Sequence, residues 1–288
     1  MLISKVCCKI YPERMHDFET ILKRFFASGS EINPYRMFTG AHLFILAVCT
    51  FFIGVLYRRT RHNDRNYVLR IIRICSGVLW AMEIIKIVFE LYAGNGGNPN
   101  KYIPLYYCSI TLYCSLLSGY ARGILKRVGD VFLVVGGIVG GIGYMVSPVT
   151  TSGVYPVFHF ITVQSFVYHS IMIYLSILLI TSGYVKLEYR DLKLYASTIV
   201  VMSIVAYNIN KYLGTNLMFV SKNYPGTAIE VLYNVNPTFF SLNITLIQAV
   251  PPFWVVYSLV KFYKNRYFDD CGETYCVSES EPEEVLLK

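Results

Sequence analysis

Long apolar runs separated by short polar segments cover most of the 288-residue chain. Seven of these runs hold roughly 20 residues, the length that a helix needs to cross a hydrocarbon core about 30 Å thick. The pattern therefore predicts an all-α polytopic transmembrane helix bundle with seven spans. The spans are expected over residues 38–57, 68–91, 102–121, 128–146, 157–180, 194–213 and 239–263. A bundle of six spans, with the first run folded in the membrane interface, is the alternative.

The N-terminal tail, residues 1–37, precedes the first apolar run. It has neither an uninterrupted apolar h-region nor a small-residue cleavage site, so no secretory signal peptide is expected. Apolar side chains in this tail recur at i, i+3, i+4, i+7 and i+8, which predicts an amphipathic helix. They are Phe18, Ile21, Leu22, Phe25 and Phe26. This helix either lies in the membrane interface or caps the bundle.

The C-terminal tail, residues 269–288, is rich in Asp and Glu and contains a single lysine, Lys288. Such an acidic segment is predicted to be disordered and cytoplasmic. The chain is thus expected to divide into an N-terminal tail over 1–37, a transmembrane bundle over 38–268 and this acidic tail.

Composition and charge agree with a membrane protein. Apolar residues make up 55% of the chain, and its mean hydropathy is +0.46. The net charge of +8 comes from basic residues in short loops, not from one patch, which argues against nucleic-acid binding. Most of these residues fall in alternate loops, and the opposite loops hold only Lys101, Lys211 and Lys222. The positive-inside rule then predicts a cytoplasmic C-terminus and, with seven spans, an external N-terminus. Basic residues in the N-terminal tail oppose this orientation.

The spacing of the cysteines and glycines indicates helix packing, and not a disulfide framework, a metal site or a phosphate loop. Of the eight cysteines, half lie in apolar runs, and their spacing matches neither a disulfide framework nor a zinc site. No metal or cofactor is expected. The run VVGGIVGGIGY spaces Gly136 and Gly140, and then Gly137 and Gly141, four residues apart. Outside a strand–helix context this pattern is typical of close helix packing, and not of a phosphate loop.

One cysteine and one histidine lie on stripes of small polar residues. In the apolar segment 101–120, Cys108 shares a helical face with Thr111, Ser115 and Gly119. In the run 157–180, a similar face holds Thr162, Ser165, His169 and Ser176. Such stripes pack against neighbouring helices in lipid, so the thiol and the imidazole could meet inside the bundle.

The pairing of Cys108 with His169 has an alternative, because isolated Cys and His residues on separate spans are often packing residues. Their positions in the two runs differ in depth by about 10 Å at 1.5 Å per residue, a gap that errors in the span boundaries could absorb. A second imidazole, His159, faces about 80° away from His169 on an ideal helix. His169 is therefore the predicted partner of the thiol.

The second run contains three charged residues, Glu83, Lys86 and Glu90. Charges in lipid are costly enough to mark functional candidates. Lys86 lies one turn from Glu83, so it could neutralise a carboxylate within one helix and act only as a structural pair. Glu83, which is expected to lie deepest, is a candidate substrate-binding residue.

Three more polar residues are candidates for substrate binding. His42 is a lone imidazole near the start of the first run, where a hydrogen-bonded interior group is the alternative. Asn208 and Lys211 lie one turn apart at the end of the sixth run. Together they could hold a lipid phosphate or an oxyanion, or form an ordinary polar helix end.

Four of the candidate residues lie in short, distinctive segments of the chain. GAHLF contains His42, MEIIK contains Glu83, PLYYCSI contains Cys108, and QSFVYHSIMIY contains His169. The chain resembles the family that includes bacterial YwaF-type proteins and the animal transmembrane protein 164, over residues 38–263. The segment NKYLGTNLMF, which contains Lys211, resembles the bacterial branch.

The resemblance implies a lipid acyltransferase. The animal member is regarded as moving a polyunsaturated chain onto an ether lysophospholipid through a cysteine and a histidine, which correspond to Cys108 and His169 here. Bacterial relatives commonly have a histidine where this chain has Tyr106, and the animal protein has one where this chain has Ser109. These departures bear on substrate identity more than on fold.

The leading hypothesis is a multi-pass membrane enzyme that moves an acyl chain from a phospholipid to a lysophospholipid through a thioester on Cys108. Two ester-exchange steps need no cofactor. It would act in the plasma membrane if bacterial and in endomembranes if eukaryotic. The alternative is a transporter or lipid-binding protein in which Glu83, Lys86, Glu90 and Lys211 line a path. A third interpretation is a structural protein whose glycine-rich span associates helices, as in a homo-oligomer.

Overall fold

The computed structural model describes residues 19–27, 34–61 and 64–268. The acidic tail and most of the N-terminal tail lie outside the described residues, so their predictions are not tested. The described part contains helices and no β-strand. Its long helices are α2 (Gly40–Thr60), α3 (Arg65–Tyr92), α5 (Gly123–Val146), α6 (Phe160–Thr181) and α7 (Asp191–Leu213). The shorter ones are α4 (Ile110–Tyr120), α8 (Ala228–Val235), α9 (Phe240–Ala249) and α10 (Pro251–Phe268), with 3-10 turns η2 (Asn95–Gly97), η3 (Pro99–Lys101) and η4 (Leu217–Phe219).

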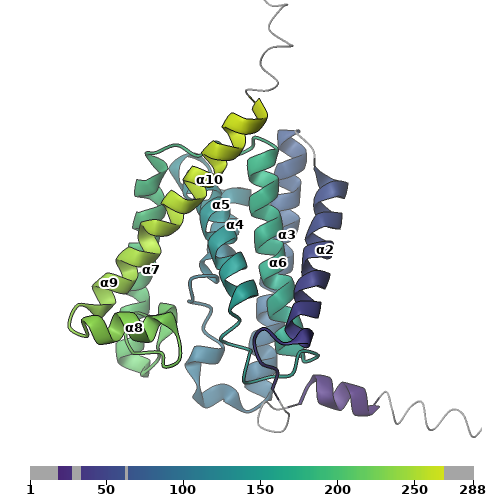
Figure 1. The fold of residues 1–288 in the computed structure, drawn as a ribbon, viewed down its shortest axis with the longest axis vertical. Helices are drawn as coiled ribbons and strands as arrows, with labels where there is room; N and C mark the ends of the chain where they lie inside the picture. Colours follow the sequence, from purple (N-terminus) through teal and green to yellow (C-terminus); the bar gives the residue numbers. More distant parts are fainter. Residues whose placement is uncertain (1–18, 28–33, 62–63, 269–288) are drawn as a thin grey trace, which may run out of the picture.

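Two groups of helices pack against a central pair, α4 and α5 (Figure 1). On one side, α6 packs along α5, and α3 and α2 pack on α6. On the other side, α9 contacts both α7 and α10, and α7 and α10 each contact α5. The core of the bundle lies along α5 and α6, because these two helices contain the longest stretches of buried residues. The prediction of an all-α helix bundle is confirmed.

Glycines allow the central helices to approach closely. A Cβ at Gly129 of α5 would lie 2.5 Å from the backbone nitrogen of Ser118 and 2.6 Å from the carbonyl oxygen of Cys114 in α4. On the α6 side, a Cβ at Gly137 would overlap Ser176, and one at Gly141 would lie 3.2 Å from the His169 carbonyl oxygen. The glycine-rich run therefore packs helices within the chain, as small residues do in membrane bundles.

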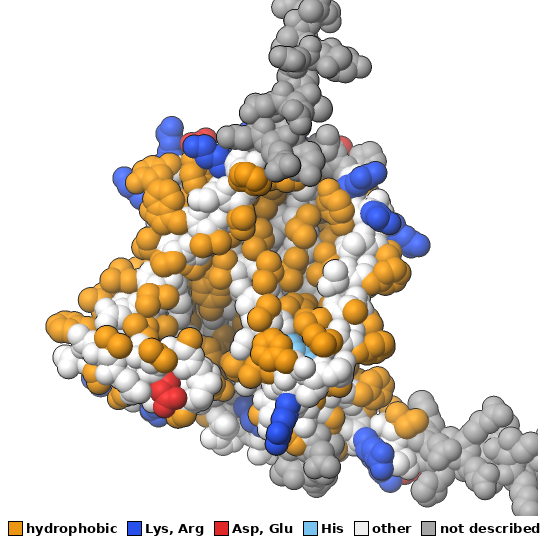
Figure 2. Space-filling model, viewed as in Figure 1, with side chains coloured by type: hydrophobic (Ala, Val, Ile, Leu, Met, Phe, Trp, Pro, Cys, Tyr) orange, Lys and Arg blue, Asp and Glu red, His pale blue; other side chains and the backbone are white. Residues whose placement is uncertain are grey.

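Within the described residues, five helices are long and apolar enough to cross a membrane: α2, α5, α6, α7 and the segment Phe240–Tyr263 formed by α9 and α10. Figure 2 shows hydrophobic side chains over the flank of the bundle, with Lys and Arg side chains near its ends. The chain is thus an integral multi-pass membrane protein. Seven spans are not shown. Helix α3 has 28 residues but includes several charges, and α4 has only 11 residues, or about 16 Å.

The prediction of one continuous helix over 102–121 is wrong, because α4 begins only at Ile110. Tyrosine side chains donate hydrogen bonds to backbone carbonyls in the segment before α4. These bonds lower the free-energy cost of a non-helical backbone in that segment. Tyr113 donates to the Pro104 carbonyl at 3.1 Å, and Tyr106 donates to the Asn100 carbonyl at 3.1 Å. Cys108 therefore precedes the helix and does not lie in its first turns.

The last predicted span, 239–263, is also interrupted. Helix α9 ends at Ala249, and α10 starts at Pro251 after Val250. Proline lacks a backbone N–H and clashes with a preceding turn, so Pro251 suits the first position of a new helix better than the interior of one.

A short helix over residues 19–25 contacts the end of the bundle. Phe25 packs near Phe158 and Phe160, with ring centroids 5.2 and 6.3 Å away. Phe26 approaches Phe89 of α3 at 6.1 Å. Of the two interpretations of this amphipathic segment, these contacts favour the helix that caps the bundle.

Candidate functional site

A cavity of about 710 Å³ lies between the two groups of helices, and Cys108, His169 and Glu83 all contribute to its wall. The wall comes from the second half of α3, the segment before α4, the end of α5, the first half of α6 and residues near η4 and α10. We call it the Cys108 cavity. Three of the predicted site residues therefore meet at one place, although they come from three separate parts of the chain.

Aromatic side chains position Cys108. Its neighbour Tyr107 places its ring against Gly140 of α5, where a Cβ would lie 3.2 Å from the ring. The Tyr107 hydroxyl lies 2.5 Å from the Tyr195 hydroxyl of α7. Ser109 is the N-cap of α4, so Cys108 is the residue directly before the helix cap.

A hydrogen bond links the segment that contains Cys108 to the helix that contains His169. The Tyr168 hydroxyl donates to the Cys108 carbonyl oxygen at 3.3 Å. Tyr168 lies eight residues after Phe160, the first residue of α6, and thus about 12 Å along that helix. The bond therefore joins the irregular segment before α4 to α6 at the residue next to His169.

His169 has one ring nitrogen engaged and the other without a partner among the described residues. Its Nδ1 lies 2.7 Å from the Ser165 carbonyl oxygen. A carbonyl can only accept, so Nδ1 carries the proton and Nε2 holds a lone pair. Nε2 is buried and makes no hydrogen bond within the described structure. This is the state in which an imidazole can accept a proton.

Two tyrosines hold the His169 ring. The Tyr144 ring stacks on it with centroids 3.8 Å apart and an interplanar angle of 8°. The Tyr168 ring meets it edge-on at 5.3 Å. The Tyr144 hydroxyl is fixed in turn by Thr151, whose Oγ1 lies 2.8 Å away. The imidazole is therefore held in one orientation at the cavity wall.

The other two described imidazoles, His159 and His42, have both nitrogens engaged and are not among the cavity-lining residues. His159 caps α6 by accepting from the Ile161 N–H at 3.2 Å, and its Nε2 donates to the Ala27 carbonyl at 2.9 Å. Burial lowers the pKa of His159, which favours the neutral ring. His42 accepts from the Phe38 N–H and donates to a carbonyl of α5. A substrate-binding role for His42 remains a prediction.

The charged residues of α3 form pairs along the cavity wall. Lys86 Nζ lies 2.6 Å from Glu83 Oε1, so the predicted pairing within one helix is confirmed. Glu90 accepts from Asn95 Nδ2 at 2.7 Å, and Lys101 Nζ lies 3.8 Å from it. The wall thus carries charge that is neutralised locally, as burial requires.

Asn208 and Lys211 are exposed on α7 and do not line the cavity. The Asn208 side chain donates to the Ile204 carbonyl of its own helix. Two neighbouring asparagines instead organise the turn after α7. Asn210 is 3% exposed and bonds four groups of that turn, whereas Asn216 does line the cavity.

Sequence reasoning missed three residues of the cavity wall, Tyr144, Tyr168 and Gln248. Gln248 donates to the Met218 carbonyl at 3.0 Å, and its Oε1 has no partner within the described structure. A lone amide in an apolar run was the signal for Gln248. Tyr144 and Tyr168 gave no comparable signal, because tyrosines occur throughout the apolar runs of this chain.

The fold and the site define a class: a multi-pass helical membrane protein whose interior cavity brings a cysteine and a histidine to one wall. A sequence model of the TMEM164 family matches residues 37–252. The chain belongs to the TMEM164 family, and the resemblance inferred from the motifs around Cys108 and His169 is confirmed. A search of curated proteins and a search of solved structures each found no match.

Proposed function

We propose that this protein is a membrane-embedded acyltransferase that moves an acyl chain between a phospholipid and a lysophospholipid through a thioester on Cys108. The observation that supports this most directly is the shared cavity, to whose wall Cys108 and His169 both contribute, while His169 Nε2 has no hydrogen-bond partner among the described residues. Membership of the TMEM164 family, together with the resemblance of the motifs, supports the same chemistry.

In the first half-reaction, His169 Nε2 takes the proton of the Cys108 thiol, and the sulfur attacks the carbonyl carbon of a phospholipid ester. The tetrahedral intermediate collapses, the C–O bond breaks, and the imidazolium returns its proton to the departing lysophospholipid hydroxyl. In the second half-reaction, Nε2 takes a proton from the hydroxyl of a different lysophospholipid, whose oxygen attacks the thioester. The thiolate leaves and regains the proton, so the exchange balances without an oxidant or a cofactor.

The dimensions and composition of the cavity suit a lipid ester. Its volume of about 710 Å³ falls within the range of small-molecule sites, roughly 300–1,000 Å³. The wall is largely apolar but carries Lys86 and Lys101 with their carboxylates at one side. An acyl chain fits the apolar part, and the polar side can contact a headgroup. The Nδ1–H bond from His169 to Ser165 would stabilise the imidazolium formed in each half-reaction.

A tagged, lipid-like acylating probe tests the nucleophile directly. It should label the reconstituted wild type and fail to label Cys108→Ala. Cys114→Ala is the matched control, because Cys114 is a buried thiol of α4 that does not line the cavity. Equal labelling of Cys108→Ala and the wild type would remove Cys108 as the nucleophile.

The choice of histidine is tested by acyl exchange in vesicles that contain a deuterated donor lipid. His169→Ala should lose most turnover, whereas His159→Ala should retain most of it, since His159 caps α6 away from the cavity wall. The opposite ranking would exclude His169 as the base.

Transport is the second candidate, and the observation that favours it is the row of charged residues on the cavity wall, Glu83, Lys86, Glu90 and Lys101. Their pairing weighs against a conducting path. Solute flux into vesicles that depends on Glu83 and is indifferent to Cys108→Ala would favour transport over acyl transfer.

A further inference from the structure

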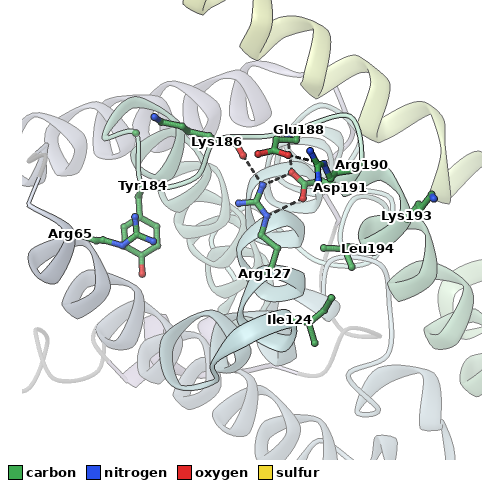
Figure 3. Close-up of a pocket in the computed structure, with 11 residues that line it drawn as sticks. Arg65, Ile124, Arg127, Tyr184, Lys186, Glu188, Arg190, Asp191, Lys193 and Leu194 are labelled. Atoms are coloured by element: carbon green, nitrogen blue, oxygen red, sulfur yellow. Dashed lines mark hydrogen bonds and ion pairs between the residues drawn. The ribbon is translucent and has the colours of Figure 1, made fainter.

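A second cavity, of about 750 Å³, lies at the opposite end of α3, α5 and α6 from the Cys108 cavity. Its wall comes from the start of α3, the start of α5, and the loop that joins α6 to α7 (Figure 3). We call it the basic cleft, because five cations line it. They are Arg65, Arg127, Lys186, Arg190 and Lys193. Neither Cys108 nor His169 contributes to this wall.

The two carboxylates of the basic cleft are already occupied. Asp191 is buried and accepts from Arg127 Nε at 2.9 Å. Glu188 lies 3.1 Å from Arg190 Nε. Figure 3 shows both carboxylates turned toward these two arginines. They are therefore not available to neutralise the other three cations.

Arg65, Lys186 and Lys193 have no carboxylate within ion-pair distance in the part of the chain that the structure describes. Arg65 lies over the Tyr184 ring, with its guanidinium carbon 4.7 Å from the ring centroid. This contact orients the guanidinium but does not cancel its charge. The cleft thus keeps a local charge of about +3, which an anion from outside can neutralise.

Hydrogen bonds from Arg127 hold the backbone of the basic cleft in place. Arg127 makes two hydrogen bonds to the Asp191 carboxylate and a third, at 2.6 Å, to the Lys186 carbonyl oxygen. This arrangement ties α5 to the loop before α7 and holds the backbone that carries Lys186. A fixed frame lowers the entropy cost of holding a bound anion.

Position and apolar contacts favour a lipid as the source of this anion. The cleft lies where the candidate spans α5 and α7 begin and α6 ends, which is the level of a headgroup layer. Ile124, 67% exposed, and Leu194 form part of its wall beside the cations. Basic pockets between membrane helices bind anionic lipid headgroups in this way.

We propose that the basic cleft binds the headgroup of an anionic phospholipid, attracted by the unpaired charges of Arg65, Lys186 and Lys193, with Ile124 against the glycerol and acyl region. By the positive-inside rule this end of the bundle faces the cytoplasm. The cleft is then a lipid site at the opposite end of the bundle from the Cys108 cavity.

The test is binding of dioctanoyl phosphatidic acid to the full-length protein in a neutral detergent, followed by microscale thermophoresis. Lys186→Gln with Lys193→Gln should weaken binding roughly 25-fold, taking about fivefold for each lysine. Both lysines are exposed, so the fold should be retained. The matched control is Arg58→Gln with Arg59→Gln, which removes two exposed charges at the same end of the bundle but outside the cleft. It should weaken binding less than about threefold.

Competitors identify the source of the phosphate. Excess inorganic phosphate and dioctanoyl phosphatidylcholine should displace little of the phosphatidic acid. Equal losses in the two double variants would mean diffuse attraction to a basic surface and would overturn the proposal. Displacement by inorganic phosphate at concentrations similar to those of the lipid would also overturn it, in favour of a soluble anion site, as would a failure of the wild type to bind.

Discussion

The contact between α4 and α5 at Gly129 should be among the least tolerant positions in the bundle. A Cβ at Gly129 would lie 2.5 Å from the Ser118 nitrogen, 2.6 Å from the Cys114 carbonyl oxygen and 3.0 Å from the Leu117 carbonyl carbon. All three atoms are backbone, so no side chain can turn aside. For Gly129→Ala the two helices must separate by several tenths of an ångström, and overpacking of this kind costs about 1–3 kcal/mol.

Gly77→Ala is the matched control, because Gly77 is a helical glycine of α3 with no atom within 4 Å of the added methyl group. Here alanine should be neutral or stabilising by up to about 1 kcal/mol, since it restricts the unfolded chain. Thermal unfolding in detergent, followed by a dye that fluoresces on reaction with buried thiols such as Cys114, measures both variants. At roughly 2–4 °C per kcal/mol, Gly129→Ala should unfold about 2–12 °C below the wild type. A Gly129→Ala midpoint equal to or above that of Gly77→Ala would refute the close α4–α5 contact.

Three further predictions concern the site and its support. His169→Ala should lower acyl exchange about 10²–10⁴-fold, and adding Cys108→Ala should make it little worse, because members of one catalytic unit are not additive; a multiplicative loss would contradict a shared role. Tyr144→Phe should keep most turnover and Tyr144→Ala should lose about 2–10-fold, since only alanine removes the stacked ring; equal turnover of the two variants in the exchange assay would count against ring positioning. Asn210→Ala should destabilise the protein by about 1–3 kcal/mol in the thiol-dye assay, because it leaves buried partners unpaired, whereas the exposed Asn208→Ala should change stability by less than about 0.5 kcal/mol.

The sequence alone determined the class of the fold and the position of most helices. Helices α2, α5, α6 and α7 begin and end within a few residues of the predicted runs. The physical reason is local, since backbone in lipid must satisfy its own hydrogen bonds and the bilayer sets the length of each apolar run. The pairing of Lys86 with Glu83 was likewise predictable, because helical geometry places residues three apart side by side.

The predicted span over 102–121 is where local reasoning failed. The hydrophobicity of this segment is compatible with a helix. Its first residues are non-helical because they form hydrogen bonds with residues far away in the chain, including Tyr107 with Tyr195 and the Cys108 carbonyl with Tyr168. Pro251 likewise divides the last apolar run, and the sequence did not reveal whether the result would be a kink or two helices.

The candidate site was also predictable only in part from the sequence. The sequence identified Cys108 and His169 as chemically competent residues, but their depths on ideal helices did not match. Only the tertiary structure placed both residues in the lining of one cavity, left His169 Nε2 without a partner among the described residues, and kept Asn208 and Lys211 out of that lining. Periodicity reports which face of a helix a residue occupies, whereas the meeting of two helices depends on packing between residues far apart in the chain. Here that packing depends on glycines at 129, 137 and 141, which let α5 hold α4 and α6 close enough to share a cavity.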